Sequence, residues 1–249
     1  MDIKDKKAIV TGGASGIGKS LVEKLSVEGA VVGVFDVNQD ALDSLKNEYP
    51  DIFCRLCDVG DPRQAEEAVN EFHDKFGAID ILVNNAGIIH NALLVYIEKG
   101  KLATYDSDMW DKVIRTNLSS VFYMTSQVAK KMFAKRTRGV IVNIGSICAA
   151  GNVGQSAYSA AKAGVSALTV TWAKELGLFG IRVAGVAPGF TETEACKRSM
   201  SEEVVKDWVK KTPSRRFSRP DEIADGILFV IRNDAFNGRV LELDGGLRM

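Results

Sequence analysis

Residues 11–18 read Thr11-Gly12-Gly13-Ala14-Ser15-Gly16-Ile17-Gly18 and join an apolar, strand-like run to an amphipathic, helix-like segment. Glycines at such a turn let the backbone bend tightly and approach a phosphate at the N-terminus of the helix. Free N–H groups and the helix dipole favour an anion there. The spacing is G-x-x-x-G-x-G, which differs from the common dinucleotide fingerprint G-x-G-x-x-G. A purely structural glycine turn is therefore the alternative interpretation, and the rest of the chain has to decide between the two.

Short apolar runs alternate with longer amphipathic segments along the whole chain. Strands joined by helix-length crossovers run parallel, and the handedness of these crossovers places helices on both faces of one sheet. The pattern predicts an α/β fold, a single-domain Rossmann-type doubly wound parallel sheet of about seven strands spanning residues 1–249. The expected strands are 7–11, 30–35, 52–57, 79–83, 139–144, 181–186 and 239–243. The expected helices are 41–47, 62–76, 107–135, 156–178, 202–210 and 221–231, besides one that ends near residue 28.

Two connections, 88–106 and 190–213, are longer than the usual links between strands and helices. Long connections in compact domains tend to be lids or binding loops. Both follow the C-terminal ends of predicted parallel strands, where ligands bind in open α/β sheets. We expect these two segments to be the substrate loops.

Charge and composition disfavour several classes of function and location. Lys+Arg and Asp+Glu each number 32, so the formal net charge is zero and a nucleic-acid or anionic-membrane surface is disfavoured. The sequence shows no signal peptide and no apolar run of membrane-spanning length, so a cytoplasmic location is expected. Cys54 and Cys57 form a C-x-x-C within a strand-like run, and no second ligand pair follows. Core packing is favoured for them over redox chemistry or zinc, as it is for Cys148, and no metal site is expected.

Asp36 ends the second predicted strand, 18 residues beyond Gly18. An acidic side chain at this place can accept hydrogen bonds from the ribose hydroxyls of an adenine dinucleotide. Its charge would repel the extra phosphate of NADP, and no arginine stands beside it in the sequence. NAD is therefore favoured over NADP. Aspartate also ends strands as a turn or helix cap, which is the structural alternative.

Tyr158 and Lys162 stand four residues apart on a predicted helix and so share one face. A phenol with an ordinary pKa near 10 is a poor acid–base catalyst at neutral pH, and a nearby ammonium lowers that pKa by stabilising the phenolate. Ser146 follows a predicted strand, where its hydroxyl could hold a substrate oxygen beside the tyrosine. By itself a Y-x-x-x-K pair is more often a surface pair, so the complete ordered set is what carries weight.

The sequence resembles the short-chain dehydrogenases/reductases of the compact, single-domain type over essentially its whole length. The motifs that carry the resemblance are Thr11–Gly18, Asp36, Asp58-Val59, Asn84-Asn85-Ala86-Gly87, Asn117, Ser146, Tyr158-Ser159-Ala160-Ala161-Lys162, Pro188-Gly189 and Asp244-Gly245-Gly246. The resemblance implies an oxidoreductase that moves a hydride between a nicotinamide and a carbonyl or alcohol carbon. It also implies a homotetramer, with the helices around 107–135 and 156–178 at its interfaces.

The resemblance further implies roles for individual residues. The cofactor-binding set is Gly12, Ser15, Gly16, Ile17, Gly18, Asp36, Asp58, Val59, Asn85, Ala86, Gly87, Tyr158, Lys162, Pro188, Gly189, Thr191 and Thr193. Asp58 and Val59 would flank the adenine, whereas Pro188, Gly189, Thr191 and Thr193 would contact the nicotinamide half. In the catalytic set, Ser146 would orient the substrate carbonyl and Tyr158 would exchange the proton. Lys162 would bind the nicotinamide ribose, and Asn117 would interrupt its helix and hold a water that relays protons to Lys162.

Within the family two branches are similar to this sequence. Residues 151–162 resemble the 3-oxoacyl-carrier-protein reductases, whereas residues 237–249 and Lys99-Gly100-Lys101 are similar to the NAD-dependent 3-hydroxyacyl-CoA dehydrogenases. Asp36 departs from the NADPH-preferring carrier-protein reductases. The sequence therefore predicts an NAD(H)-dependent 3-hydroxyacyl/3-oxoacyl thioester oxidoreductase. A polyol, sugar or other secondary-alcohol dehydrogenase is the first alternative, and a non-catalytic NAD-binding scaffold is the second.

Overall fold

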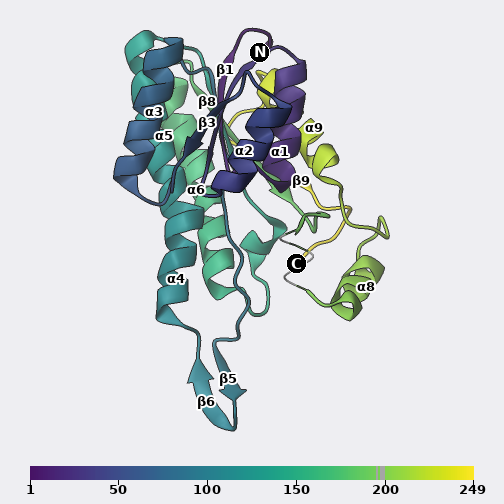
Figure 1. Cartoon of the computed structure of the whole chain (residues 1–249). Helices are drawn as coiled ribbons and strands as arrows, with labels where there is room; N and C mark the ends of the chain where they lie inside the picture. The colour runs from purple at the N-terminus through teal and green to yellow at the C-terminus, as the bar shows by residue number, and fades with distance from the viewer. Residues whose placement is uncertain (195, 197–199) are drawn as a thin grey trace.

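A parallel sheet of seven strands forms the centre of the protein (Figure 1). The structure is a computed structural model that describes residues 1–249 except 195 and 197–199. The strand order is β3-β2-β1-β4-β7-β8-β9, and each neighbouring pair is parallel. The strands are β1 Lys7–Thr11, β2 Val31–Asp36, β3 Phe53–Leu56, β4 Ile81–Asn84, β7 Val140–Ile144, β8 Arg182–Pro188 and β9 Val240–Leu243. The predicted doubly wound α/β fold is confirmed.

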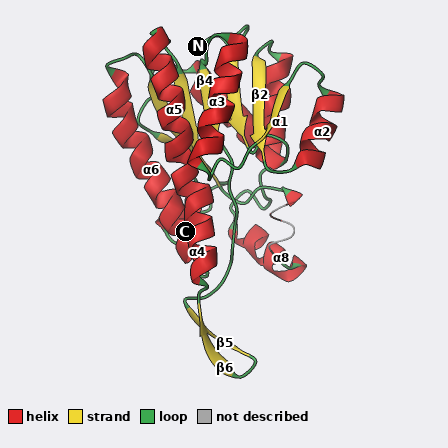
Figure 2. Ribbon diagram, turned by 60° about the vertical axis from the view of Figure 1, so that its left-hand side comes forward, coloured by secondary structure: helices red, strands yellow, loops and turns green. Residues whose placement is uncertain are grey.

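Helices cover both faces of this sheet and enclose two apolar cores (Figure 2). One core lies under α1 Gly16–Val27, α2 Gln39–Glu48 and α9 Pro220–Arg232. The other lies under α3 Pro62–Phe76, α5 Ser120–Lys135 and α6 Ser156–Gly177. The central strands are buried on both sides, which explains why they read as continuous apolar runs rather than alternating ones. The chain order reverses between β1 and β4, so the sheet has its topological switch point there.

Local sequence signals fix several helix ends. Asp61 caps α3 by accepting hydrogen bonds from the backbone N–H groups of Arg63 and Gln64, and Pro62 occupies the first turn. Gly77 ends the same helix in the left-handed conformation. With these signals at both ends, the predicted helix 62–76 is observed with the same bounds. Most other predicted elements are confirmed with ends displaced by one or two residues.

The predicted long helix 107–135 is interrupted. It consists of α4 Ser107–Ile114, a π-helical turn at Arg115–Ser119, and α5. A π-helical turn inserts an extra residue into the helical repeat and occurs frequently at functional sites. The local break expected at Asn117 is therefore present.

The predicted loop 88–106 contains an antiparallel hairpin, which its sequence pattern did not indicate. It is formed by β5 Val95–Glu98 and β6 Lys101–Thr104, which are joined at Lys99 and Gly100. Both turn residues have positive φ, the sign that a two-residue hairpin turn favours. The hairpin extends away from the sheet beyond α4 (Figures 1 and 2) and exposes Ile97 and Leu102.

The second predicted loop, 190–213, includes the helix α8 Glu202–Lys211. Its residues 195 and 197–199 lie outside the described residues. Over the part of the chain that the structure describes, we find no helix long and apolar enough to span a membrane.

Candidate active site

Two adjoining cavities lie at the carboxyl edge of the sheet, around the switch point between β1 and β4. The smaller has a volume of about 320 Å³ and the larger about 500 Å³. They have in common the lining residues Ile17, Asn85, Gly87, Ile88 and Thr193, so they form one crevice. All the predicted site residues line it except Gly18.

The glycine-rich turn forms one end of the smaller cavity. Gly12 has a φ of 61°, and a Cβ on it would lie 2.9 Å from the Cα of Ala86. Gly18 faces inward, because a Cβ there would lie 2.2 Å from the carbonyl oxygen of Gly12. Gly18 therefore permits close packing of α1 on the turn. The first turn of α1 has no acidic residue, so the positive end of its dipole is available to an anion.

The segment after β4 is fastened to the glycine-rich turn. The Thr11 hydroxyl oxygen accepts hydrogen bonds from the backbone N–H groups of Asn85 and Ala86, at 3.0 and 3.1 Å. The Asn85 amide nitrogen donates to the carbonyl oxygens of Thr11 and Gly12, at 3.0 and 2.9 Å. These bonds hold two neighbouring strand ends together and rigidify the floor of the crevice.

Asp36 also lines the smaller cavity, together with Asp58 and Val59. Its two carboxylate oxygens accept hydrogen bonds from the backbone N–H groups of Ala14 and Asn38, each at 3.1 Å. No lysine or arginine belongs to the described lining of this cavity. Lys19, the basic residue that follows the glycine-rich turn, instead pairs with Glu48 at 2.8 Å.

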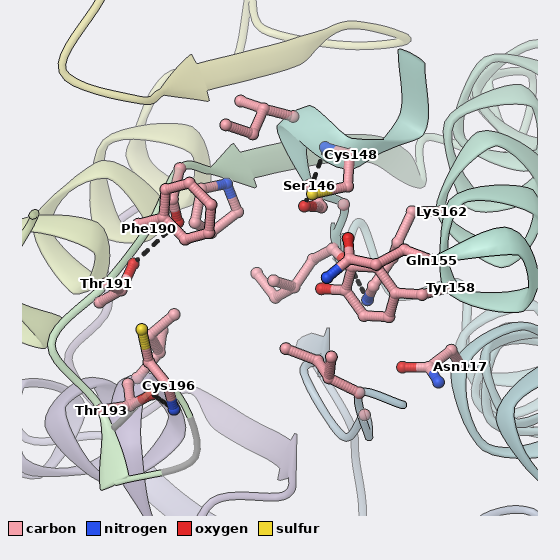
Figure 3. A pocket seen from close by; sticks show the side chains of 18 of the residues that line it. Asn117, Ser146, Cys148, Gln155, Tyr158, Lys162, Phe190, Thr191, Thr193 and Cys196 are labelled. Atoms are coloured by element: carbon pink, nitrogen blue, oxygen red, sulfur yellow. Dashed lines mark hydrogen bonds between the residues drawn. The ribbon is translucent and has the colours of Figure 1, made fainter. Parts of the chain in front are cut away.

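Ser146, Tyr158 and Lys162 meet in the larger cavity (Figure 3). Ser146 precedes a short 3₁₀ helix, Ile147–Ala150, and its hydroxyl oxygen accepts a hydrogen bond from the Cys148 N–H at 3.1 Å. Tyr158 and Lys162 lie one turn apart in α6. The Lys162 ammonium donates to the carbonyl oxygen of Ile144 at 2.7 Å and lies 5.7 Å from the centre of the Tyr158 ring.

Asn117 joins this group from the π-helical turn. Its side chain is fully buried, donates to the carbonyl oxygens of Ile88 and Val113, and accepts from the Ile88 N–H. A Cβ on Gly87 would lie 2.5 Å from the Asn117 amide oxygen, which explains the glycine at this place. The helix break thus connects α4 and α5 to the segment after β4.

Comparisons with known proteins identify the family to which this chain belongs. The profile described as short chain dehydrogenase matches residues 6–204, which is well over half of the chain. The chain belongs to the short chain dehydrogenase family.

Individual members of the family are similar over the full length of this short chain dehydrogenase. The 3-oxoacyl-[acyl-carrier-protein] reductase FabG of Thermotoga maritima is 39% identical, with 99% of each chain covered. The 3alpha-hydroxysteroid dehydrogenase of Mediterraneibacter gnavus is 35% identical, covering 100% of this chain and 99% of its own. The crystal structure of levodione reductase superposes with a TM-score of 0.89 at 32% identity, covering 98% and 97%. The protein is therefore an oxidoreductase that acts on CH–OH groups and binds a nicotinamide cofactor.

Burial shifts the pKa values of Tyr158 and Lys162 in the site of this short chain dehydrogenase. It raises the pKa of the Tyr158 phenol to about 12, although a hydrogen bond with Ser146 acts in the opposite direction. It lowers the pKa of the Lys162 ammonium to about 8. The lowered tyrosine pKa expected from the sequence is thus absent from this structure, because desolvation of the phenolate outweighs the hydrogen bond with Ser146.

The nicotinamide half of the crevice, as inferred from the family, is bounded by the end of β8. Pro188, Gly189, Thr191 and Thr193 line the larger cavity as expected. A Cβ on Gly189 would lie 2.7 Å from the Cα of Asp244, so this glycine lets the end of β8 approach the C-terminal segment. Phe190, which the sequence analysis did not single out, stacks on Phe217 with ring centres 5.1 Å apart and also lines the cavity.

Several further lining residues were missed. Ile88, Ile89, Asn91, Phe190, Cys196 and Met200 fall within the predicted substrate loops, but no sequence pattern distinguished them from their neighbours. Cys148 is buried, as its interpretation as a packing residue required, and it also lines the larger cavity. Gln155 was overlooked, although its place three residues before Tyr158 could have indicated it.

The C-x-x-C pair behaves as the packing interpretation predicts. Both thiols are free; Cys57 is buried in one core, and Cys54 packs against the other. Burial raises the pKa of the Cys57 thiol to about 11, which leaves it protonated and unreactive at neutral pH.

Proposed function

We propose that this protein is an NAD(H)-dependent oxidoreductase that interconverts 3-hydroxyacyl and 3-oxoacyl thioesters. The observation that carries the proposal is the meeting of Ser146, Tyr158 and Lys162 in one cavity that adjoins the glycine-rich turn. A scaffold that only binds a dinucleotide has no need of a half-buried phenol beside a buried ammonium. The FabG relatives, named as 3-oxoacyl-[acyl-carrier-protein] reductases, support this choice of substrate.

The lining of the larger cavity favours a neutral, partly apolar substrate. Lys162 is the one charged side chain among its described lining residues. The remaining walls include the apolar side chains Ile88, Ile89, Ile147, Phe190 and Met200. An acyl chain fits walls of this kind, because apolar surface removed from water stabilises the complex by about 25 cal/mol per Å². A polyol or sugar would place part of its hydroxyl groups against these apolar walls, where they lose hydrogen bonds to water.

The three polar groups can divide the chemistry between them. The Ser146 hydroxyl oxygen accepts a hydrogen bond from Cys148 N–H, so its own hydrogen can turn toward a substrate oxygen. Tyr158 donates a proton to that oxygen in reduction and accepts it in oxidation. The Lys162 ammonium is held by Ile144 and attracts the negative charge that develops on the phenol. The bound nicotinamide supplies or accepts the hydride.

Asn117 and Lys162 serve the proton supply in this proposal. The Asn117 amide is fixed to the Ile88 backbone at 2.9 and 3.1 Å, so the helix break is held open beside the cavity. A water bound at this break would carry protons to Lys162. Lys162 also binds the nicotinamide ribose, while Pro188, Gly189, Thr191 and Thr193 contact the nicotinamide half.

The smaller cavity supports NAD rather than NADP. Each oxygen of Asp36 keeps a lone pair beyond its bond to a backbone N–H, so the carboxylate can accept from ribose hydroxyls. A 2′-phosphate at the same place would meet this carboxylate with no lysine or arginine in the described lining. Asp58 and Val59 line the same cavity and are proposed to flank the adenine.

The whole chain, residues 1–249, is proposed to act as one cytoplasmic catalytic domain, with substrate loops at 88–106 and 190–213. We also propose that it assembles as a homotetramer through α4, α5 and α6. The aromatic side chains of Phe122 and Phe133 on α5 are 53% and 57% exposed, and contact with a second copy would remove this apolar surface from water.

A cyclic or other secondary alcohol is the second candidate substrate class. It is favoured by the similarity to proteins named 3alpha-hydroxysteroid dehydrogenase and levodione reductase. Initial rates with acetoacetyl-CoA, a hydroxysteroid, a cyclic diketone and a polyol, each with NADH or NAD⁺ and with the NADP forms, separate the candidates. The proposal expects the highest kcat/KM for acetoacetyl-CoA with NADH. Absence of turnover with every 3-oxoacyl thioester would contradict it.

A further inference from the structure

A chain of amides runs along one wall of the larger cavity. We call Asn91, Asn152 and Gln155 the amide clamp. The Gln155 amide nitrogen donates to the Asn91 side-chain oxygen at 3.0 Å, and its oxygen accepts from the Asn152 amide at 3.2 Å. Gln155 is 8% exposed and lines the cavity, as does Asn91 (Figure 3 shows Gln155). The clamp therefore connects the segment that leads into the hairpin with the turn that precedes α6.

Gln155 occupies a place where its side chain would ordinarily serve the helix. It is the N-cap residue of α6, yet its side chain makes no capping hydrogen bond. Ser, Thr, Asp and Asn are the residues favoured there, because their short side chains reach the first free N–H groups. Here the longer side chain reaches across to Asn91 instead. Its backbone carbonyl still accepts from Ser159 N–H at 2.8 Å, so Gln155 is fixed to the first turn of the helix that carries Tyr158.

The backbone repeats the connection that the side chains make. Ala92 forms an isolated parallel bridge with Gln155, and the Ala92 N–H donates to the Gly154 carbonyl oxygen at 2.9 Å. At its other end the same segment is held by Asn117, which binds both backbone groups of Ile88. Residues 88–92, which supply part of the cavity wall, are thus fastened at two points, one to each of the helices that bear the predicted catalytic residues.

The clamp also reaches the turn that carries Ser146. The Asn152 amide lies 3.9 Å from the Cys148 sulfur, within hydrogen-bond distance for sulfur, and the Cys148 N–H donates to the Ser146 hydroxyl oxygen. A displacement of Gln155 would therefore affect Tyr158 through α6 and Ser146 through the 147–155 turn. Misplacement of reacting groups by about 1 Å can lower a rate by about 10²-fold.

We propose that Gln155 is a positioning residue that holds the proton donor Tyr158, the Ser146 turn and the 88–92 wall in one geometry. The inference rests on the proposed function, because it takes Tyr158 as the proton donor. It adds that the substrate wall and the proton donor move together, so the hairpin-bearing segment and the catalytic helix act as one unit. Gln155 acts through its neighbours and takes no part in the proton transfer.

The test compares Gln155→Ala, Asn91→Ala and the double variant in steady-state reduction of acetoacetyl-CoA by NADH. We expect each single variant to lose about 10- to 100-fold in kcat while the KM for NADH changes less than twofold. The double variant should be no slower than the slower single variant, because residues in one hydrogen-bonded unit are not additive. The exchanged pair Asn91→Gln with Gln155→Asn should recover part of the rate.

A matched control distinguishes a general loss of stability from a displacement of the catalytic side chains. Thr169→Val removes a buried hydrogen bond that the same helix α6 receives from Asn143 in β7, away from the cavity lining. This variant should lower Tm and keep kcat within twofold. Tyr158→Phe, measured alongside, tests the proposed function separately: activity in that variant would contradict the proton donor, whatever the Gln155 variants do.

A second readout does not depend on turnover. Hydrogen exchange at the Ala92 amide, which donates to Gly154, should become at least tenfold faster in Gln155→Ala and stay unchanged in Thr169→Val. Wild-type kcat in Gln155→Ala, losses that multiply in the double variant, or unaltered Ala92 exchange would each overturn the inference. If the wild-type enzyme reduces no 3-oxoacyl thioester, the proposed function fails and the Ala92 exchange still decides whether the clamp exists.

Discussion

The ammonium of Lys162 lies 5.7 Å from the centre of the Tyr158 ring and is 4% exposed, with the Ile144 carbonyl oxygen as its hydrogen-bond partner. Among the described residues, no carboxylate lines the cavity around it. A cation so placed is poorly solvated, and burial lowers its pKa to about 8. The pair is therefore electrostatically costly to the fold, as expected where side chains are arranged for chemistry rather than for stability.

The first prediction concerns the pH dependence of the free energy of unfolding, to which Lys162 contributes. The folded pKa of Lys162 is about 8, against an ordinary value of 10.5, so the folded state binds fewer protons than the unfolded state between these values. The free energy of unfolding of the wild type should therefore rise by about 3 kcal/mol relative to Lys162→Met as pH increases from 8 to 10.5. Urea unfolding of both proteins at several pH values measures this. A difference that is independent of pH in this window would contradict the assigned burial.

The second prediction concerns the pH dependence of reduction. Reduction requires the Tyr158 phenol protonated and benefits from a charged Lys162. The phenol keeps its proton up to a pKa of about 12, whereas Lys162 loses its proton near pH 8. With NADH, kcat/KM for acetoacetyl-CoA should be level below pH 8 and fall above it, well before the phenol titrates. A rate that rises between pH 8 and 10 would show that the ammonium is dispensable.

Some residues of the site could be predicted from the sequence and others could not, depending on the residue type. Ser146, Tyr158 and Lys162 were recognised because their chemistry and order are distinctive, and the structure brings them together. Gln155 and Phe190 were not recognised. The role of an amide or an aromatic ring depends on the residues that it contacts, and these contacts are set by the fold. For Gly18 the structure adds a packing reason, since a glycine needed for close packing looks the same in sequence as one beside a phosphate.

The sequence predicted the central sheet and its helices better than it predicted the β5–β6 hairpin. Buried parallel strands such as Val140–Ile144 carry an apolar run that few other structures produce. The β5–β6 hairpin escaped notice because its four-residue strands expose most of their side chains, so burial leaves no clear pattern. The positive φ of Lys99 in its turn is also unusual for a residue other than glycine, asparagine or aspartate.

The third prediction concerns cofactor choice. Asp36→Asn removes the charge that faces the ribose end of the smaller cavity, while the amide oxygen can still accept one backbone hydrogen bond. We expect the NAD⁺ over NADP⁺ ratio of kcat/KM to fall at least about tenfold, equivalent to about 1.4 kcal/mol. Asp40→Asn, an exposed change in the first turn of α2, is the control and should leave the ratio unchanged. An unaltered ratio in Asp36→Asn would remove the basis for NAD preference.

The fourth prediction concerns Gly87 and Asn117. In Gly87→Ala the new Cβ would lie 2.5 Å from the Asn117 amide oxygen, so the bonds to Ile88 must shift. The free energy of unfolding should fall by about 1–3 kcal/mol, as for other overpacked sites. Adding Asn117→Ala removes the clashing atom and should restore part of the stability without restoring activity. If the double variant is less stable than both single variants, the proposed clash is not the cause.

In the proposed mechanism, Tyr158 exchanges the proton, and the crevice binds the dinucleotide independently of the Tyr158 hydroxyl. Tyr158→Phe removes one oxygen and leaves the ring in place, so NADH affinity measured by fluorescence titration should stay within about threefold of wild type. The kcat for acetoacetyl-CoA should fall by about 10²- to 10⁴-fold, the usual contribution of a positioned general acid. Wild-type turnover in Tyr158→Phe, measured on the same preparation that binds NADH, would contradict the account.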